Sequence, residues 1–279
     1  MLPDEREARA KLLELFGHEF AQMCELHDFS VSLIPFPLRI EARRNLDKST
    51  ADVALALYVK ACRQFRAIQL LCEGGLGGDA WALARNLFES SLALCFVLQP
   101  RFRPKKSGKQ LPKVKGKPLS SRFRARLYIA NLAFEKERML DQWQNTRRLR
   151  RAAKRDQRAA IQKRGKQAEA VIGPDWTARL KRSRSYSGLS IKDLADTLKL
   201  TTSYATFYRI ASWPTHAADA DMLFSAESTL DIAPSPRGVL EALAAASILL
   251  FRCIEQLNHG LHLGKDSEVM KFASRIRLT

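Results

Sequence analysis

An arginine and a histidine are separated by six intervening residues in the stretch Tyr204-Ala-Thr-Phe-Tyr-Arg-Ile-Ala-Ser-Trp-Pro-Thr-His216. The guanidinium of Arg209 can bind a phosphate through two parallel hydrogen bonds and stabilise negative charge that develops there. The imidazole of His216 titrates near neutral pH and can accept or deliver a proton. Arg209 and His216 are therefore the candidate catalytic residues for phosphodiester cleavage. The alternative is that His216 only hydrogen-bonds the end of the preceding helix.

A second polar pair, Arg85 and Glu89, stands four residues apart in a stretch that is otherwise mostly apolar. A helix that is apolar on nearly all sides belongs in a core, so its charges must be paired. The pair is either a structural ion pair or the lining of a polar cleft that orients the catalytic residues. Tyr208 and Ser212, near Arg209, and Lys60, on the preceding helix, are further candidates for this supporting role.

Positive charge is concentrated between residues 101 and 185, which hold 27 Lys and Arg against 6 Asp and Glu. The whole chain has a net charge of +18, so the remaining residues are close to neutral. Polyphosphate is the common partner of such a field, because each neutralised phosphate releases counterions. We predict a nucleic-acid partner, RNA rather than DNA. The candidate contacts are Lys105, Lys106, Lys109, Arg147, Arg148, Arg150, Arg151, Lys154, Arg155, Lys163 and Arg164.

Helical periodicity runs through nearly all of the patterned segments, and no stretch shows the alternation of a strand. The Gly-rich link at 74–78 is so short that the two helices it joins must be antiparallel. Ser49, Asp79 and Ser190 are candidate N-caps. The predicted helices span residues 4–27, 49–73, 80–99, 190–198, 202–212, 238–259 and 267–276.

The basic insertion begins with a Lys-, Pro- and Gly-rich loop at 101–118 and continues as a helix from Ser120 to about Ala170. Beyond Arg147 this helix has little to bury and should project into solvent. Its first half carries apolar residues that can face a core: Phe123, Leu127, Ile129, Leu132, Phe134 and Leu140. We predict an all-α bundle in three parts, residues 1–100 with a helical hairpin, the insertion at 101–185, and residues 186–279 completing the bundle.

Composition limits the class of protein further. The chain has 5 cysteines without a CxxC pair, and they resemble buried free thiols of a reducing compartment. The first residues are acidic, unlike a signal peptide, and the longest apolar run, 242–251, is too short for a bilayer. His259 and His262 have no further ligands nearby in the sequence, so we expect no metal and no cofactor. We predict a cytoplasmic protein without a membrane partner.

Three stretches together resemble a known group of proteins. They are Leu70 to Gly75 followed by Asp79, Ala80 and the Arg85–Glu89 pair; the helix that carries Lys60; and Tyr204 to His216. They resemble an uncharacterised family of bacterial helical proteins, a domain of unknown function, which is similar to the HEPN (higher eukaryotes and prokaryotes nucleotide-binding) superfamily. The resemblance implies an all-α bundle, frequent homodimers, and a metal-independent ribonuclease that uses Arg209 and His216. Such enzymes are often toxins or anti-phage effectors.

Two other functions remain open. Residues 190–210 resemble a helix-turn-helix, with Lys199 where a glycine usually forms the turn, and this pattern favours a non-catalytic DNA or RNA reader. The basic insertion could instead meet an acidic protein, which would make the chain a scaffold or assembly subunit.

Overall fold

The computed structural model describes residues 3–38, 47–100, 102, 119–145, 155–212 and 235–276. Within these ranges all regular elements are helices, and pairing of the β type is limited to isolated bridges. The predicted all-α fold is therefore confirmed. The helices are α1 (Pro3–Ser32), α2 (Pro35–Leu38), α4 (Lys48–Glu73), α5 (Gly77–Leu98), α6 (Ser121–Asn145), α7 (Arg155–Ile172), α8 (Pro174–Ser183), α9 (Ile191–Thr197), α10 (Thr201–Ser203), the π-helix η1 (Tyr204–Tyr208), α12 (Val239–Leu261) and α13 (Asp266–Ile276).

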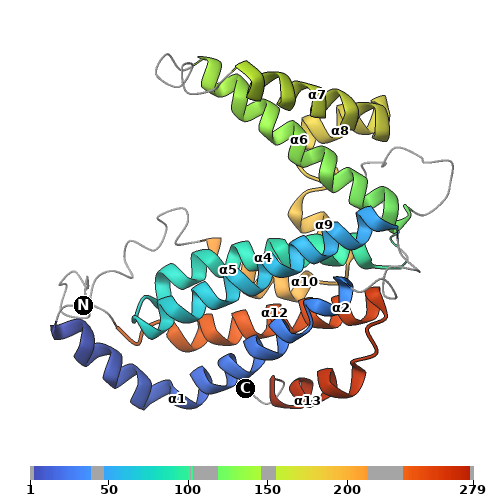
Figure 1. Ribbon diagram of the computed structural model, residues 1–279. Coiled ribbons are helices and arrows are strands. Elements are labelled where there is room, and N and C mark those ends of the chain that lie inside the picture. The colour runs from blue at the N-terminus through green and yellow to red at the C-terminus, as the bar shows by residue number, and fades with distance from the viewer. Residues whose placement is uncertain are drawn as a thin grey trace.

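The core lies where α1, α4, α5 and α12 pack together in the lower part of Figure 1. Large side chains such as Tyr58, Phe65, Phe88 and Phe96 are almost fully buried there. Burying an aromatic side chain of this size contributes a few kcal/mol. By length and composition α5 is apolar enough to cross a membrane, but 67% of its apolar stretch is buried inside the protein. It is therefore the central helix of the bundle.

The predicted hairpin of α4 and α5 is confirmed, and its turn is locked against the start of α12. A Cβ atom on Gly77 would lie 2.4 Å from the carbonyl oxygen of Arg237, so only glycine fits there. The Ser235 amide donates a hydrogen bond to the Gly75 carbonyl at 3.0 Å. This contact starts α5 at Gly77, two residues before the predicted N-cap Asp79.

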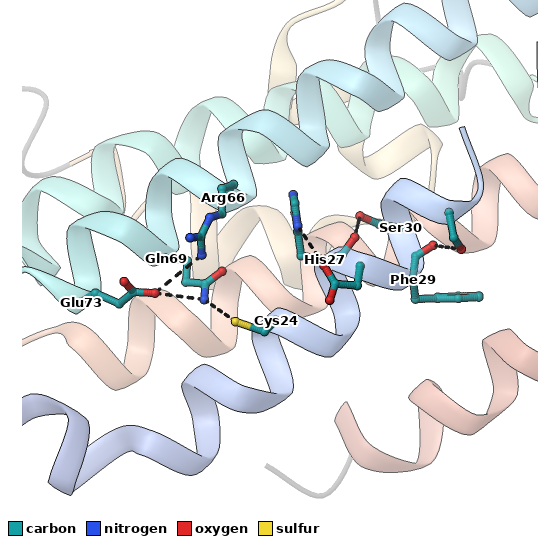
Figure 2. Close-up of polar contacts among 9 residues, drawn as sticks. Cys24, His27, Phe29, Ser30, Arg66, Gln69 and Glu73 are labelled. Atoms are coloured by element: carbon teal, nitrogen blue, oxygen red, sulfur yellow. Dashed lines mark hydrogen bonds and ion pairs between the residues drawn. The ribbon is translucent and has the colours of Figure 1, made fainter. Parts of the chain in front are cut away.

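Ser49 was also a wrong cap, because its hydroxyl bonds to the carboxylate of Asp47 and no side chain caps α4. Helix α1 continues to Ser32, beyond the predicted helix end at residue 27. Its end is supported from outside the helix, since the Tyr58 hydroxyl donates to the Ser30 carbonyl at 2.9 Å. The Ser30 hydroxyl donates in turn to the His27 carbonyl (Figure 2).

A second set of polar contacts fixes α1 to α4 (Figure 2). The amide of buried Gln69 donates to the Cys24 sulfur at 3.0 Å and to the Glu73 carboxylate at 3.1 Å. Arg66 and Arg9 approach the same carboxylate at 3.6 and 3.2 Å. Cys24 is exposed, whereas the other four cysteines are buried as predicted.

Helices α6, α7 and α8 form an arm that projects from the bundle, as the upper part of Figure 1 shows. The prediction of one helix from Ser120 to about Ala170 was wrong, because α7 folds back along α6. The Glu137 carboxylate lies directly over Gly165, where the two helices approach each other. Helix α7 ends at Ile172, and α8 starts at Pro174 after the single residue Gly173.

The arm is joined to the bundle by Arg124, a fully buried side chain on α6. Its guanidinium donates to the backbone carbonyls of Phe96, Val97 and Gln99, at or beyond the end of α5, and to the Leu119 carbonyl. The final carbonyls of a helix have no partner within the helix and carry partial negative charge. Arg124 supplies both the donors and the positive charge. Burial lowers the pKa of this guanidinium to about 10, so it remains charged at neutral pH.

We expect Arg124→Lys to lower the free energy of unfolding by about 3 kcal/mol, because one ammonium cannot reach all of these carbonyls and buried acceptors are left without partners. Chemical denaturation would measure the loss. The matched control is Arg122→Ala on the same helix, whose exposed ion pair with Asp47 should be worth less than about 1 kcal/mol. Equal effects of the two substitutions would contradict the anchoring role.

Candidate functional site

Arg85 and Glu89 on α5 meet Tyr208 on η1. The Arg85 guanidinium donates a hydrogen bond to the Tyr208 hydroxyl at 3.0 Å and lies 4.9 Å from the centre of the same ring. The Glu89 carboxylate approaches Arg85 at 3.6 Å, which makes an ion pair rather than a short hydrogen bond. The Arg85 side chain is 22% exposed and that of Glu89 is 40% exposed. The polar pair on the apolar helix thus reaches solvent and also holds the segment that carries Arg209.

The π-helix sets the direction of the two tyrosines. Its Arg209 amide donates to the Tyr204 carbonyl, five residues back. Tyr204 and Tyr208 stack on each other with ring centres 5.2 Å apart, and both rings pack against Phe88. Such short π-helical turns occur often at functional sites. Here the turn brings two stacked aromatic rings beside the Arg85 guanidinium.

Glu89 acts electrostatically on phenols on both sides of it. Burial raises the pKa of Tyr208, and the Glu89 carboxylate raises it further, while Arg85 lowers it. Burial also raises the pKa of Tyr186 well above the ordinary value, again with a contribution from Glu89. Both phenols are therefore protonated at neutral pH and can donate hydrogen bonds. The Tyr186 ring packs on Tyr128 of α6, so this polar cluster lies at the base of the arm.

The other candidates of the site are placed as follows. The Arg209 side chain is exposed after the last turn of η1. Ser212 is half-buried, and its hydroxyl donates to the Tyr208 carbonyl at 2.6 Å. Lys60 is exposed on α4 and forms no hydrogen bond or ion pair with the described members of the cluster. His216 lies outside the described residues.

The candidate nucleic-acid contacts fall mainly in segments that the structure leaves undescribed. Lys163 and Arg164 are exposed on α7. Further exposed cations on α7 and around the end of α8 are Lys166, Arg182 and Arg184. Lys105, Lys106, Lys109, Arg147, Arg148, Arg150, Arg151 and Lys154 lie outside the described residues, and of Arg155 only the backbone is described.

The helix-turn-helix-like segment has one matching and one differing feature. Ser190 caps α9 by accepting a hydrogen bond from the Asp193 amide, as predicted, and Lys199 has a φ of 60°, the left-handed turn geometry that favours glycine. The second helix, however, is only three residues of α10 followed by the π-helix. Its aromatic side chains pack towards α5, which leaves Thr201, Thr202 and Arg209 exposed.

Within the described parts of the chain, three or more His, Cys, Asp or Glu side chains do not gather into a possible metal site. His259 lies 3.9 Å from the Asp266 carboxylate and has no second ligand group of this kind.

The sequence profile of a family of unknown function, DUF5677, matches residues 51–229. The chain belongs to this family. No curated protein and no solved structure shows significant similarity to it.

The stretch that matches DUF5677 contains the features of the site described above. It includes most of α4, all of α5, the arm and η1, and thus the Arg85, Glu89 and Tyr208 cluster. It leaves out α1, α12 and α13, which complete the bundle around that stretch. The family's common sequence therefore coincides with the arm and the polar cluster.

Sequence reasoning missed the parts played by Tyr186, Tyr128 and Arg124. The segment Ser185-Tyr-Ser187 carries no helical periodicity, so nothing marked Tyr186 as the residue that connects the arm to Glu89. Phe88 and Tyr204 had a usable signal, since each is an aromatic residue within one helical turn of a candidate polar residue.

We expect Tyr208→Phe to lower the free energy of unfolding by about 1 kcal/mol, because it removes the hydroxyl that accepts from Arg85 and keeps the stacked ring. Tyr204→Phe is the matched control, since the neighbouring hydroxyl makes no hydrogen bond with the described residues and its loss should cost little. Urea denaturation of both variants would test this, and a larger loss in the Tyr204 variant would contradict the assignment.

Proposed function

We propose that the chain binds RNA through the arm and cleaves it without a metal ion, in the manner of HEPN ribonucleases. The observation that carries the proposal is the charge of residues 101–185, with 27 Lys and Arg against 6 Asp and Glu. Binding to single-stranded RNA would release counterions and give a large favourable contribution at low salt.

The exposed cations of the arm support this assignment. Lys163, Lys166 and Arg182 have no carboxylate partner among the described residues, so their charge is available to phosphates. Lys181, in contrast, is engaged by Glu169. Structural ion pairs therefore use only part of the arm's positive charge.

The chemical step rests on the spacing of Arg209 and His216. In this proposal Arg209 binds the scissile phosphate and stabilises its added negative charge. His216 removes the proton of the 2′-hydroxyl, whose oxygen attacks the phosphorus, and a proton is then delivered to the departing 5′-oxygen. The products are a 2′,3′-cyclic phosphate and a 5′-hydroxyl. Arg85, Glu89, Tyr208 and Ser212 hold the segment that carries Arg209, and Lys60 has no contact that supports a part in this.

The remaining proposals rest on the same resemblance to the HEPN superfamily. The chain would act in the cytoplasm as a homodimer, as a toxin or as an effector of defence against phage.

For RNA binding, we expect Lys163→Ala with Lys166→Ala to weaken affinity and to reduce the slope of log K against log salt by about 1.4, since each phosphate contact to a single strand contributes about 0.7. Fluorescence anisotropy with a labelled RNA oligonucleotide at several salt concentrations would measure both quantities.

The matched control is Arg63→Ala with Lys271→Ala, which removes two exposed cations from the bundle instead of the arm. An equal effect of both double variants would show non-specific attraction and would contradict binding through the arm. Preference for a DNA duplex over RNA would favour the helix-turn-helix reading of residues 190–210.

For catalysis, we expect the wild-type protein to cleave RNA in EDTA and to leave 2′-O-methyl RNA intact. His216→Ala and Arg209→Ala should each slow cleavage by at least about 100-fold, the usual contribution of a general acid–base residue. His259→Ala, which changes an exposed histidine away from η1, should cleave at the wild-type rate. Absence of cleavage by the wild type, or equal rates in all variants, would remove the catalytic part and leave RNA binding standing.

A further inference from the structure

A groove of about 450 Å³ runs along the arm between α6 and α7 and reaches Ser49 at the start of α4. The large apolar side chains that line it are unusually exposed to solvent. Ile129 is 45% exposed, Leu132 is 46% exposed and Val171 is 50% exposed. The helical pattern predicted that Ile129 and Leu132 face a core, and their exposure corrects this. Apolar side chains gathered on an exposed surface mark interaction sites in soluble proteins.

The lining residues of the two helices have the same spacing. Ile129, Leu132, Ala133 and Lys136 line it from α6, at steps of i, i+3, i+4 and i+7. Arg164, Gln167, Ala168 and Val171 line it from α7 at the same steps. This spacing places each set on one face of its helix. Two neighbouring helices with such matched faces form a groove into which a third helix can pack.

Three cations surround this apolar floor, and none of the lining residues is acidic. Because α7 folds back along α6, Lys136 and Arg164 lie towards the same end of the groove. Arg126 lines the other end, near Ser49. Within the described parts of the chain Lys136 and Arg164 make no ion pair or hydrogen bond, whereas the charge of Arg126 lowers the pKa of the nearby Asp47 carboxyl. The groove therefore favours an occupant that is apolar along one side and negatively charged, most of all at the end that meets Lys136 and Arg164.

We propose that the groove docks one amphipathic α-helix of an acidic partner protein. From Arg126 to Lys136 it spans ten residues of α6, about 15 Å, which matches about three turns of a docked helix. Leucine-type side chains of the partner cover Ile129, Leu132 and Val171, and its carboxylates face Lys136, Arg164 and Arg126. A second copy of this chain fits poorly, because self-pairing of this face brings like charges together.

This inference does not depend on ribonuclease activity. The groove combines an apolar floor with three cations, of which Arg164 is also a candidate RNA contact, whereas the cations tested for RNA binding, Lys163 and Lys166, are not among its lining residues. Failure of one proposal would leave the other unaffected.

The test uses a fluorescein-labelled helical peptide of about 15 residues, with Leu at i, i+3, i+4 and i+7 and Glu near both ends. Anisotropy should show saturable binding to the full chain. A peptide with the same Leu pattern and Lys in place of Glu should bind at least tenfold more weakly. Leu132→Ser with Val171→Ser should weaken the acidic peptide at least tenfold, and so should Lys136→Gln with Arg164→Gln.

Two matched variants control for surface change and for net charge. Leu70→Ser alters an apolar side chain that is 51% exposed on α4, and Lys163→Gln with Lys166→Gln removes two cations of α7 outside the groove. Both should bind the peptide within about twofold of the wild type. Circular dichroism checks that each variant is folded, which we expect because the altered side chains are exposed.

Lack of saturable binding to the wild type, or equal loss in the groove and control variants, would overturn the proposal. Binding that depends on Lys136 and Arg164 and is insensitive to Leu132→Ser with Val171→Ser would also overturn it, since that pattern describes a general anion site such as an RNA surface.

Discussion

The guanidinium of Arg124 positions the basic arm of α6, α7 and α8 relative to the bundle. It is buried without a carboxylate partner among the described residues, and backbone carbonyls at or beyond the end of α5 and near the start of α6 satisfy it. An isolated buried charge is costly, yet the carbonyls that end a helix carry partial negative charge and lack partners of their own. The buried charge and the unpaired carbonyls, each unfavourable alone, thus compensate each other at one point. Because that point joins α5 to α6, it also sets the direction in which the arm leaves the bundle.

Helix α5 also carries Arg85 and Glu89 of the polar cluster. It therefore connects this cluster to the basic arm. Arg85 holds Tyr208 from one side, and Glu89 raises the pKa of both Tyr208 and Tyr186. A phenol with a raised pKa is a hydrogen-bond donor at neutral pH and a poor general base. Tyr208 is therefore suited to positioning, and in the proposed phosphodiester reaction another group would have to remove the proton. This chemistry is consistent with an imidazole as the base and with an aromatic cluster that orients the neighbouring segment.

Local patterns predicted the helical class, the α4–α5 hairpin and the Ser190 cap, because these depend on residues close in the sequence. The groove was missed because period alone cannot distinguish a core stripe from an exposed one: Leu127 and Leu132 fit the same helical pattern, yet Leu127 is buried and Leu132 is 46% exposed. Arg124 was one basic residue among 27 in its region, and its role depends on the end of another helix. The contact of Arg85 with Tyr208 joins residues 123 positions apart, so no local pattern indicates it. The π-helical turn was missed because its hydrogen bonds span only one residue more than those of an α-helix. Tertiary packing decides the exposure of Leu132, the role of Arg124 and the contact of Arg85 with Tyr208.

The arm combines two kinds of surface that respond differently to salt. The proposed phosphate binding by Lys163 and Lys166 would draw its free energy from released counterions and weaken steeply as salt rises. Contact with Ile129, Leu132 and Val171 draws its free energy from buried apolar area, which salt affects much less. An acidic helix in the groove would neutralise Arg126, Lys136 and Arg164 and so lower the positive potential over the whole arm, including the cations that we propose bind RNA. By reciprocity, RNA on the arm would weaken the docked helix by the same factor. If the arm binds RNA as proposed, a partner in the groove would therefore control access to the arm without covering the polar cluster.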